Sequence, residues 1–493
     1  MHDLTLRPGI PGPDGFGKPM PEGGIRNSLN SNGHIPPHKP VLKEKVFADG
    51  RPDQWLEYVP ENLPQGSRPP LIISCHGGGV NGQFQFEETS WCYIAEREGA
   101  VAVFPYAGGQ TRSWLSEDAP AAPPAPGARP SMLDVFTRSP DGRASEDAHH
   151  IQFLKGLIQE MKDQYGIDEG RVYIQGMSMG DIMTMMFARV CGHLLAGAAS
   201  TAGPSPEVAL FHEDGSIKGY DCPVPLYQSR GELDSIVIAK KEGQETTRQD
   251  VNAYNRAFWL KVNECDALPR IAIRDVSNLA FYTGKKANVV YRDVKHREHG
   301  QTLDDAQWAW ETLFKNTRRN PDGSLTWSDT ALSAKGDVDA AALCDGCGYA
   351  YINNQRVKLA VPAFTETVKT MDMAARSVRD YRSELYVPVG FLSQYFGAEV
   401  CLAADGRSAV IHAPGGDCTV AQESVGCMQN GVLRAMFLPA KLRDGALCVA
   451  VRWFAENIFG KQVTECDGAL YISDHHAEMS KDMAYLLRSI LAE

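Results

Sequence analysis

The stretch RVYIQGMSMGDIM, residues 171–183, decides the fold of this protein. Its first five residues have the Val, Tyr and Ile content of a short buried strand, and from Asp181 apolar residues recur at helical spacing. Between them, residues 176–180 read Gly-Met-Ser-Met-Gly and fit the pattern G-x-S-x-G. In that context the pattern is typical of a nucleophile elbow, a sharp strand-to-helix turn with Ser178 at its apex. The glycines are expected because side chains there would collide with the strand and the helix.

The alternative interpretation is a glycine- and serine-rich turn that fits a loose pattern, so the flanking sequence has to decide. Strands and helices alternate on both sides of the turn, which predicts a mostly parallel sheet covered on both faces. A hairpin is expected at 46–60. The other predicted elements are buried strands at 70–76, 100–106, 196–200, 224–229 and 287–294, and helices at 88–99, 145–166, 181–190 and 304–317.

Length and charge narrow the class of protein. A chain of 493 residues predicts two or three domains, and 43% apolar residues suffice for packed cores. The formal net charge of -12 argues against a nucleic-acid or anionic-membrane surface. No stretch reaches the roughly 18 apolar residues of a membrane helix. Because residues 1–24 lack the pattern of a secretory signal, the sequence as written predicts a cytoplasmic protein, or a secreted one if the N-terminus has been trimmed.

The twelve cysteines are irregularly spaced. Several fall in expected strands or helices, which favours reduced, buried thiols, although the even count also allows disulfides. Cys344-Asp-Gly-Cys347 is a C-x-x-C without a second pair at zinc-site spacing, so no metal is predicted. The Pro/Ala-rich stretch 119–130 cannot form a core and is either a solvated loop or a flap over an active site.

Two loops downstream of Ser178 carry the partners that a serine nucleophile needs. Ester hydrolysis through serine requires a histidine base, a carboxylate that orients it, and amides that hold the oxyanion. The strand at 224–229 leads to Glu232 and Asp234, and the strand at 287–294 leads to His296 and His299. This is the chain order of serine, acid and histidine that accompanies an elbow.

Upstream, His76-Gly-Gly-Gly79 ends a buried strand and matches the loop that supplies an oxyanion amide. Its plain alternative is a glycine-rich turn. This loop is followed in order by the elbow, the loop with Glu232 and Asp234, and the loop with His296 and His299. Because these independent features all fit one site, they favour the catalytic interpretation.

These motifs together resemble a known family. Residues 44–317 resemble the polyhydroxybutyrate depolymerase and feruloyl esterase-like group of alpha/beta hydrolases, through WLEYVPENLPQGSRPPLIISCHGGG, FPYAGGQTRSW, the elbow segment, LYQSRGELDSIV and EHGQTLDDAQWAWETL. The resemblance implies an α/β fold and a serine carboxylic-ester hydrolase that needs no cofactor. It implies small, carbohydrate-linked (acetyl or hydroxycinnamoyl) or polyester-type esters as substrates.

The resemblance also implies roles for individual residues. The catalytic residues would be Ser178, Asp234 and His299, with the amides of Gly78 and Met179 as oxyanion hole. Trp114 is a candidate substrate-binding residue, with simple packing as its alternative.

The sequence departs from the group's pattern in two places. Asp181 follows the elbow where the group usually has another glycine, and Gly-Gly follows the first His-Gly in place of bulkier residues. His149 and His150 are expected to be packing or surface residues. A serine peptidase of the same fold, or a binding protein with an inactive hydrolase domain, remain alternative functions.

The C-terminal part carries an internal repeat. Residues 385–400 and 447–463 share a strand, a short helix, Phe-Gly and a further strand, and each copy continues to an Asp-Gly turn. Residues 340–475 resemble the copper amine oxidase N-terminal-like domain, which holds no copper and implies a binding, spacer or oligomerisation role. The predicted organisation is an irregular arm (1–43), an alpha/beta-hydrolase domain (44–319), a linker (320–339) and a smaller α+β repeat domain (340–493).

Overall fold

The computed structural model describes residues 8, 19, 21–24, 36–108, 113–115, 141–235, 246–328 and 335–492. The chain divides into two compact units, Met1–Asp266 with Phe281–Ala334, and Ala267–Ala280 with Lys335–Glu493. The predicted Pro/Ala-rich loop at 119–130 and most of the predicted N-terminal arm lie outside the described residues.

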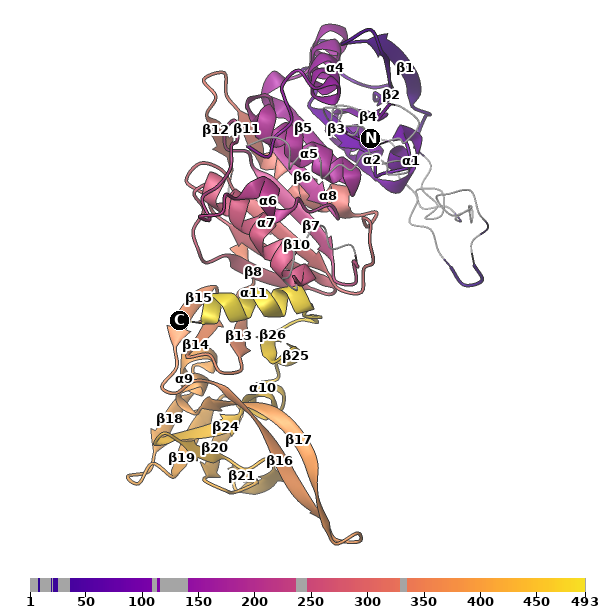
Figure 1. Ribbon diagram of the computed structural model, residues 1–493. Helices are drawn as coiled ribbons and strands as arrows, with labels where there is room; N and C mark the ends of the chain where they lie inside the picture. The colour runs from indigo at the N-terminus through magenta and orange to yellow at the C-terminus, as the bar shows by residue number, and fades with distance from the viewer. Residues whose placement is uncertain are drawn as a thin grey trace, which may run out of the picture. The chain divides into compact units, whose positions relative to one another are not determined.

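A large sheet forms the centre of the first unit (Figure 1). Within this unit its order is β1-β2-β4-β3-β5-β6-β7-β10. β2 runs antiparallel to β1 and β4, whereas β4, β3, β5, β6, β7 and β10 are mutually parallel. The strands are β1 (Val41–Val46), β2 (Pro52–Tyr58), β3 (Leu71–Cys75), β4 (Val101–Pro105), β5 (Val172–Met177), β6 (Gly197–Thr201), β7 (Leu226–Gly231) and β10 (Val289–Val294). β8 (Arg270–Arg274) and most of β9 (Ser277–Tyr282) belong to a segment that groups with the second unit.

Helices cover both faces of this sheet, as alternation along β5 shows. The Tyr173 ring packs on Trp310 of α8 (Asp305–Thr312) and on Phe314, which follows that helix, and Gln175 accepts a hydrogen bond from Trp91 of α2 (Trp91–Glu98). Gly176 faces the other way, against α5 (Met179–Val190). Because successive side chains of a strand point to opposite faces, α2 and α8 lie on one face and α5 on the other. This confirms the predicted mostly parallel sheet with helices on both faces.

Among the other helices of the first unit, the sequence predicted α4 but not α1, α6 or α7, and the helix predicted at 304–317 ends as α8 at Thr312. Residues 145–148 are not helical, because Ser145 Oγ accepts from the N–H of Asp147 in a local turn and does not cap the helix. The α4 helix therefore begins at His149, four residues after the predicted start at residue 145. These helices are α1 (Gly82–Glu88), α4 (His149–Tyr165), α6 (Glu207–Leu210) and α7 (Arg248–Val262).

The end of the first unit contains a hairpin of β11 (Thr317–Arg319) and β12 (Leu325–Trp327), which turns at Asp322-Gly323. This hairpin lies where the predicted linker begins. The predicted boundaries at 43, 319 and 339 stay a proposal.

The second unit confirms the predicted repeat. In the first copy β17 (Ser377–Pro388) leads into α9 (Gly390–Phe396) and β18 (Glu399–Leu402). In the second copy β24 (Ala446–Ala450) leads into α10 (Val451–Asn457) and β25 (Gln462–Cys466). Gly397 and Gly460, with φ of 70° and 65°, follow the two helices in the left-handed region that glycine tolerates.

The unit's other elements complete three antiparallel sheets, ordered β15-β14-β13-β26-β25, β16-β17-β24-β23 and β18-β19-β20-β21-β22. They are β13 (Ala341–Cys344), β14 (Tyr349–Ile352), β15 (Gln355–Lys358), β16 (Phe364–Asp372), β19 (Ser408–Ala413), β20 (Gly416–Ala421), β21 (Gly426–Gln429), β22 (Val432–Ala435), β23 (Lys441–Arg443), β26 (Ala469–Ser473) and α11 (Lys481–Leu491).

The segment Ala267–Ala280 groups with this second unit although it precedes the end of the first in sequence. Buried Asp337 accepts hydrogen bonds from the N–H of Ile273 at 3.0 Å and from the hydroxyl of Tyr471 at 2.6 Å. The amide of Asn278 donates to the carbonyl of Glu478 at 3.0 Å. Among the described helices of both units, none combines the length and apolar content of a membrane span.

Candidate active site

Ser178 lies at a strained turn between β5 and α5. Its φ of 56° and ψ of -116° put a non-glycine residue in the left-handed half of backbone space, which L-residues rarely adopt. A backbone hydrogen bond fixes the turn to the end of β6, because the N–H of Ser178 donates to the carbonyl of Thr201 at 2.9 Å. This is the geometry of a nucleophile elbow.

The two glycines of the motif are required by close packing. A Cβ on Gly176 would lie 2.0 Å from the carbonyl oxygen of Gly180, and a Cβ on Gly180 would lie 2.2 Å from the carbonyl oxygen of Cys75. Both contacts are to backbone, which has no rotamer to move away. The expectation that side chains at these positions would collide with the strand and the helix is confirmed.

A chain of hydrogen bonds joins three of the predicted site residues. His299 Nε2 lies 3.0 Å from Ser178 Oγ, and His299 Nδ1 lies 3.0 Å from Asp234 Oδ2. Because a carboxylate only accepts, Nδ1 carries the proton, and Nε2 is left to accept from the serine hydroxyl. The arrangement can activate a hydroxyl nucleophile.

The alternative residues of the same loops have other partners. Glu232 Oε2 accepts from the backbone N–H of His296 at 3.2 Å. His296 itself has a φ of 64°, at the turn that follows β10. The structure thus brings Asp234 and His299 to Ser178, and it uses Glu232 and His296 to connect the acid loop with the histidine loop.

Buried Asp305 fixes the loop that contains His299. Its carboxylate accepts from Arg292 Nη1, Arg297 Nη1 and the backbone N–H of Thr302, each at 2.8 Å. Burial alone would raise the pKa of Asp305, but the charges of Arg297 and Arg292 together with its hydrogen bonds lower it. Since Arg297 and Thr302 flank His299, an ionised Asp305 holds the chain on both sides of His299.

The predicted oxyanion residues lie side by side. A Cβ on Gly78 would lie 2.3 Å from Sδ of Met179, so only glycine fits there without moving Met179. Met179 is the first residue of α5, where backbone N–H groups have no acceptor inside the helix. The assignment of these two amides to an oxyanion hole stays a prediction.

Trp114 contacts the glycine-rich loop. It is 0% exposed, its indole N–H donates to the carbonyl of His76 at 2.8 Å, and its ring centroid lies 5.1 Å from that of the His76 imidazole. His76 Nε2 in turn accepts from the N–H of Ala107 at 2.9 Å. These contacts position the loop that contains Gly78, and a role of Trp114 in substrate binding stays a prediction.

The two histidines of α4 have partners other than Ser178, Asp234 and His299. His149 bonds Asp49 at 3.0 Å and Asp53 at 2.8 Å. His150 Nδ1 accepts from the N–H of Leu115 at 3.0 Å. Both side chains are buried, and both connect α4 to neighbouring loops.

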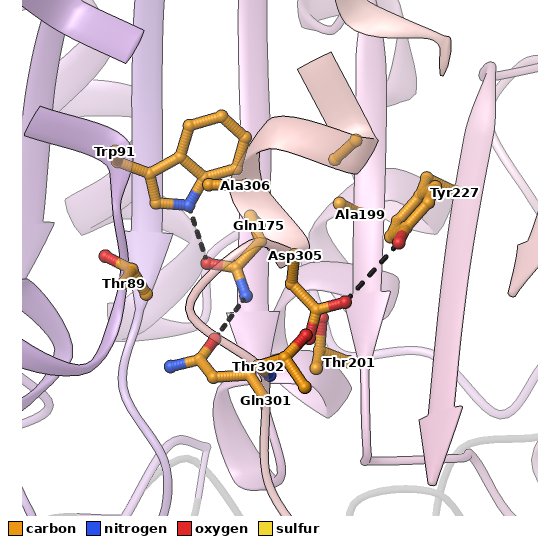
Figure 2. A pocket seen from close by; sticks show the side chains of 11 residues that line it. Thr89, Trp91, Gln175, Ala199, Thr201, Tyr227, Gln301, Thr302, Asp305 and Ala306 are labelled. Atoms are coloured by element: carbon orange, nitrogen blue, oxygen red, sulfur yellow. Dashed lines mark hydrogen bonds between the residues drawn. The ribbon is translucent and has the colours of Figure 1, made fainter. Parts of the chain in front are cut away.

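Side chains that include Trp91, Gln175 and Gln301 line a small cavity (Figure 2). Gln175 Oε1 accepts from the indole of Trp91 at 3.1 Å, and Gln175 Nε2 donates to Gln301 at 3.3 Å. The cavity volume of about 10 Å³ suits at most one water molecule, so this is not where an ester substrate binds.

Sequence reasoning missed Gln175, Arg230 and Asp305. The signal for Gln175 was a long polar side chain inside an otherwise apolar strand, which burial makes costly unless it is paired. Arg230 directly follows the strand predicted at 224–229 and has polar neighbours, so the sequence carried no such signal for it. Within the described ranges, no three His, Cys, Asp or Glu side chains are arranged to hold a metal ion.

Comparison with known proteins shows relatives of both parts. The Copper amine oxidase N-terminal domain family matches residues 369–469. A bifunctional acetylxylan esterase/xylanase of Neocallimastix patriciarum is 24% identical over 268 residues, 54% of this chain and 33% of its own length. A poly(3-hydroxybutyrate) depolymerase of Ralstonia pickettii is 28% identical over 151 residues, 29% of this chain and 27% of its own.

Feruloyl esterase B of Piromyces equi is 25% identical over 177 residues, 34% of this chain and 32% of its own length. The chain thus spans about a third of the length of these curated relatives. The solved acetyl xylan esterase from Aspergillus awamori superposes with a TM-score of 0.40 and 15% identity, over 55% of this chain and 98% of the other.

The strand order, the elbow and these relatives agree with the predicted resemblance. The chain has the alpha/beta-hydrolase fold and is similar in sequence to acetylxylan esterases, feruloyl esterases and polyhydroxybutyrate depolymerases, and its residues 369–469 match the copper amine oxidase N-terminal domain.

Proposed function

We propose that this protein is a serine carboxylic-ester hydrolase. The observation that carries the proposal is the hydrogen-bond chain from Asp234 through His299 to Ser178, with the serine at a strained elbow. A Gly/Ser-rich turn without catalytic purpose needs neither the strained serine nor a histidine aligned on its hydroxyl.

In this mechanism Ser178 Oγ attacks the ester carbonyl while His299 Nε2 accepts the hydroxyl proton. Asp234 keeps the imidazole in the required tautomer and stabilises the imidazolium that forms. The N–H groups of Gly78 and Met179 bind the negative oxygen of the tetrahedral intermediate. The imidazolium then protonates the departing alcohol, and water repeats the sequence to release the acid from the acyl-enzyme.

The names of the relatives support the substrate class. They include an acetylxylan esterase/xylanase, a feruloyl esterase and a poly(3-hydroxybutyrate) depolymerase. We therefore propose acetyl or hydroxycinnamoyl esters, carbohydrate-linked or small, and polyester-type esters as candidates. We further propose that the C-terminal unit contacts a polysaccharide surface or a second copy of the chain and takes no part in the chemistry.

The test is hydrolysis of p-nitrophenyl acetate, butyrate and octanoate by the wild type and by Ser178→Ala. The expected result is activity in the wild type, strongest for the ester that fits best, and a loss of about 10⁴-fold or more in the variant while its thermal melt is unchanged. Equal activity in both proteins contradicts the assignment of Ser178. Cleavage of peptide substrates without ester cleavage favours the peptidase alternative.

A further inference from the structure

Asp181 is a buried carboxylate in the first turn of the helix that follows Ser178. Its side chain is 0% exposed. Oδ2 accepts from Ser200 Oγ at 2.8 Å, from the backbone N–H of Gly203 at 2.8 Å and from Arg230 Nη1 at 3.3 Å. Oδ1 has no hydrogen-bond partner among the residues that the structure describes. All three donors come from β6, β7 or the loop after β6, so this one carboxylate connects α5 to two neighbouring strands.

Arg230 is the cation of this network and belongs to the strand that presents the acid. It is 3% exposed and lies four residues before Asp234. Besides Asp181, its guanidinium donates to the carbonyl of Ser229 at 2.9 Å and to the hydroxyl of Ser200 at 2.8 Å. Arginine is suited to such a place because its planar fork makes several directed bonds at once.

The network also touches the elbow through Gly203. A Cβ at Gly203 would lie 2.1 Å from the carbonyl oxygen of Ser178 and 2.7 Å from Cβ of Asp181. The loop after β6 is therefore pressed against Ser178, and Asp181 holds that loop by its N–H. A displacement of the Asp181 carboxylate moves the support of the nucleophile.

Burying the charges of Asp181 and Arg230 costs free energy, so the pair is stable only in a well-defined geometry. A buried ion pair is stable only when its remaining donors and acceptors are satisfied, and loss of one partner leaves the other charge uncompensated. Apolar residues of similar size could pack the same volume without this cost. The pair is therefore better explained by its directed contacts than by stability alone.

We propose that Asp181 and Arg230 are positioning residues that hold the nucleophile elbow in register with the acid-bearing strand β7. The inference rests on the proposed function and concerns the same site. Neither residue reacts with substrate. The pair sets the distance at which the Ser178 hydroxyl meets His299, whose loop is carried by the next strand, β10.

The test compares Asp181→Asn, Arg230→Gln and the double variant on the full chain with p-nitrophenyl acetate. Each single variant is expected to lower kcat about 10- to 100-fold with KM within about twofold of the wild type, because small displacements of aligned groups cost about this much. The double variant is expected to lose less than the product of the two single losses.

The matched control is Asp168→Asn. Asp168 bonds Arg318 Nη2 at 2.9 Å just before β5 begins, at the end of that strand remote from the elbow. The control is expected to keep kcat within about twofold, even where its melting temperature falls as far as that of Asp181→Asn. If kcat falls in proportion to the melting temperature in all variants, Asp168→Asn included, the positioning role is overturned.

A milder variant covers the case in which a single charge variant does not fold. Ser200→Ala removes one donor to Asp181 and one acceptor of Arg230 without leaving a charge unpaired, and is expected to lower kcat about threefold to tenfold. Unchanged kcat in Ser200→Ala and in whichever charge variant folds overturns the proposal.

The labelling rate of Ser178 by a fluorophosphonate separates this inference from the proposed function. A wild type that neither hydrolyses esters nor takes the label overturns both. A wild type that is labelled, together with Asp181 and Arg230 variants labelled equally fast, overturns only the positioning role. The expected result is fast labelling of the wild type and of Asp168→Asn, and labelling slowed about as much as kcat in the other variants.

Discussion

The backbone N–H of Leu233 donates to the carbonyl oxygen of Arg297 across 2.8 Å. This single bond joins the loop that carries Asp234 to the loop that carries His299. It is reinforced where Glu232 accepts from the N–H of His296 at 3.2 Å. The acid and the base are therefore aligned by the backbone of their loops before any substrate arrives, which is the preorganisation that acyl transfer needs.

Removal of the acid's charge tests this alignment. Asp234→Asn is expected to lower kcat on p-nitrophenyl acetate about 10²- to 10⁴-fold with little change in KM, because the amide no longer fixes the tautomer of His299. Glu232→Gln is the matched control, since it keeps an acceptor for the N–H of His296. It should stay within about tenfold of the wild type, and equal losses in both variants contradict the assignment of Asp234.

The elbow glycines predict a stability effect. Gly176→Ala forces a methyl group against the carbonyl oxygen of Gly180, where the gap is 2.0 Å, and should destabilise the first unit by about 3 kcal/mol or more. Gly108→Ala is the control, because a Cβ there meets nothing within 4 Å. Differential scanning calorimetry should show a large fall in melting temperature only for Gly176→Ala. Similar melts for the two variants would count against the packing described at the elbow.

Substitution of Trp114 is expected to change kcat but not KM. Trp114→Phe keeps the ring but leaves the buried carbonyl of His76 without its donor, at a cost of about 1–3 kcal/mol of stability. Since that carbonyl precedes the Gly77–Gly79 loop, kcat should fall several-fold while KM and acyl-chain preference stay the same. A changed preference among acetate, butyrate and octanoate with kcat unchanged would instead support contact between Trp114 and substrate.

Asp181 predicts a pH dependence of stability. Burial raises its pKa from 3.8 to about 7 in the folded protein. Between these values the folded chain binds a proton that the unfolded chain has lost, so the free energy of unfolding falls as pH rises from about 4 to about 7. The contribution has a slope of up to about 1.4 kcal/mol per pH unit.

Urea unfolding of the wild type and of Asp181→Asn at several pH values in this window provides the measurement. All other titrating groups are shared, so the difference between the two curves isolates Asp181. The wild type should lose stability relative to the variant as pH rises. Parallel curves would show that Asp181 is ionised throughout the window.

The sequence predicted the architecture well where local patterns dictate it. The elbow, the acid loop and the histidine loop each follow a strand, and the carboxyl ends of parallel strands meet at one edge of a sheet. Chain order thus predicted that the loop containing His296 and His299 would approach Ser178, and the family resemblance selected His299. The repeated strand-helix-glycine pattern similarly predicted the two copies in the second unit.

What the sequence did not predict depends on contacts between distant residues. The Asp181–Arg230 pair joins positions 49 residues apart, and no spacing rule indicates it. The same holds for Asp305 and Ser229, which are 76 residues apart. The predicted start of α4 at residue 145 was wrong because Ser145 accepts a hydrogen bond from a nearby N–H in a local turn, an alternative that serine adopts as readily as capping a helix. The grouping of Ala267–Ala280 with the second unit follows from long-range bonds such as that of Ile273 to Asp337.

The central claim, that Ser178 is a nucleophile activated by His299, is tested most directly by mass spectrometry after treatment with a fluorophosphonate. The expected result is one covalent adduct per chain, mapped to the peptide that contains Ser178, with no adduct in Ser178→Ala and much slower labelling in His299→Ala. An unmodified wild type, or an adduct on another residue, would contradict it.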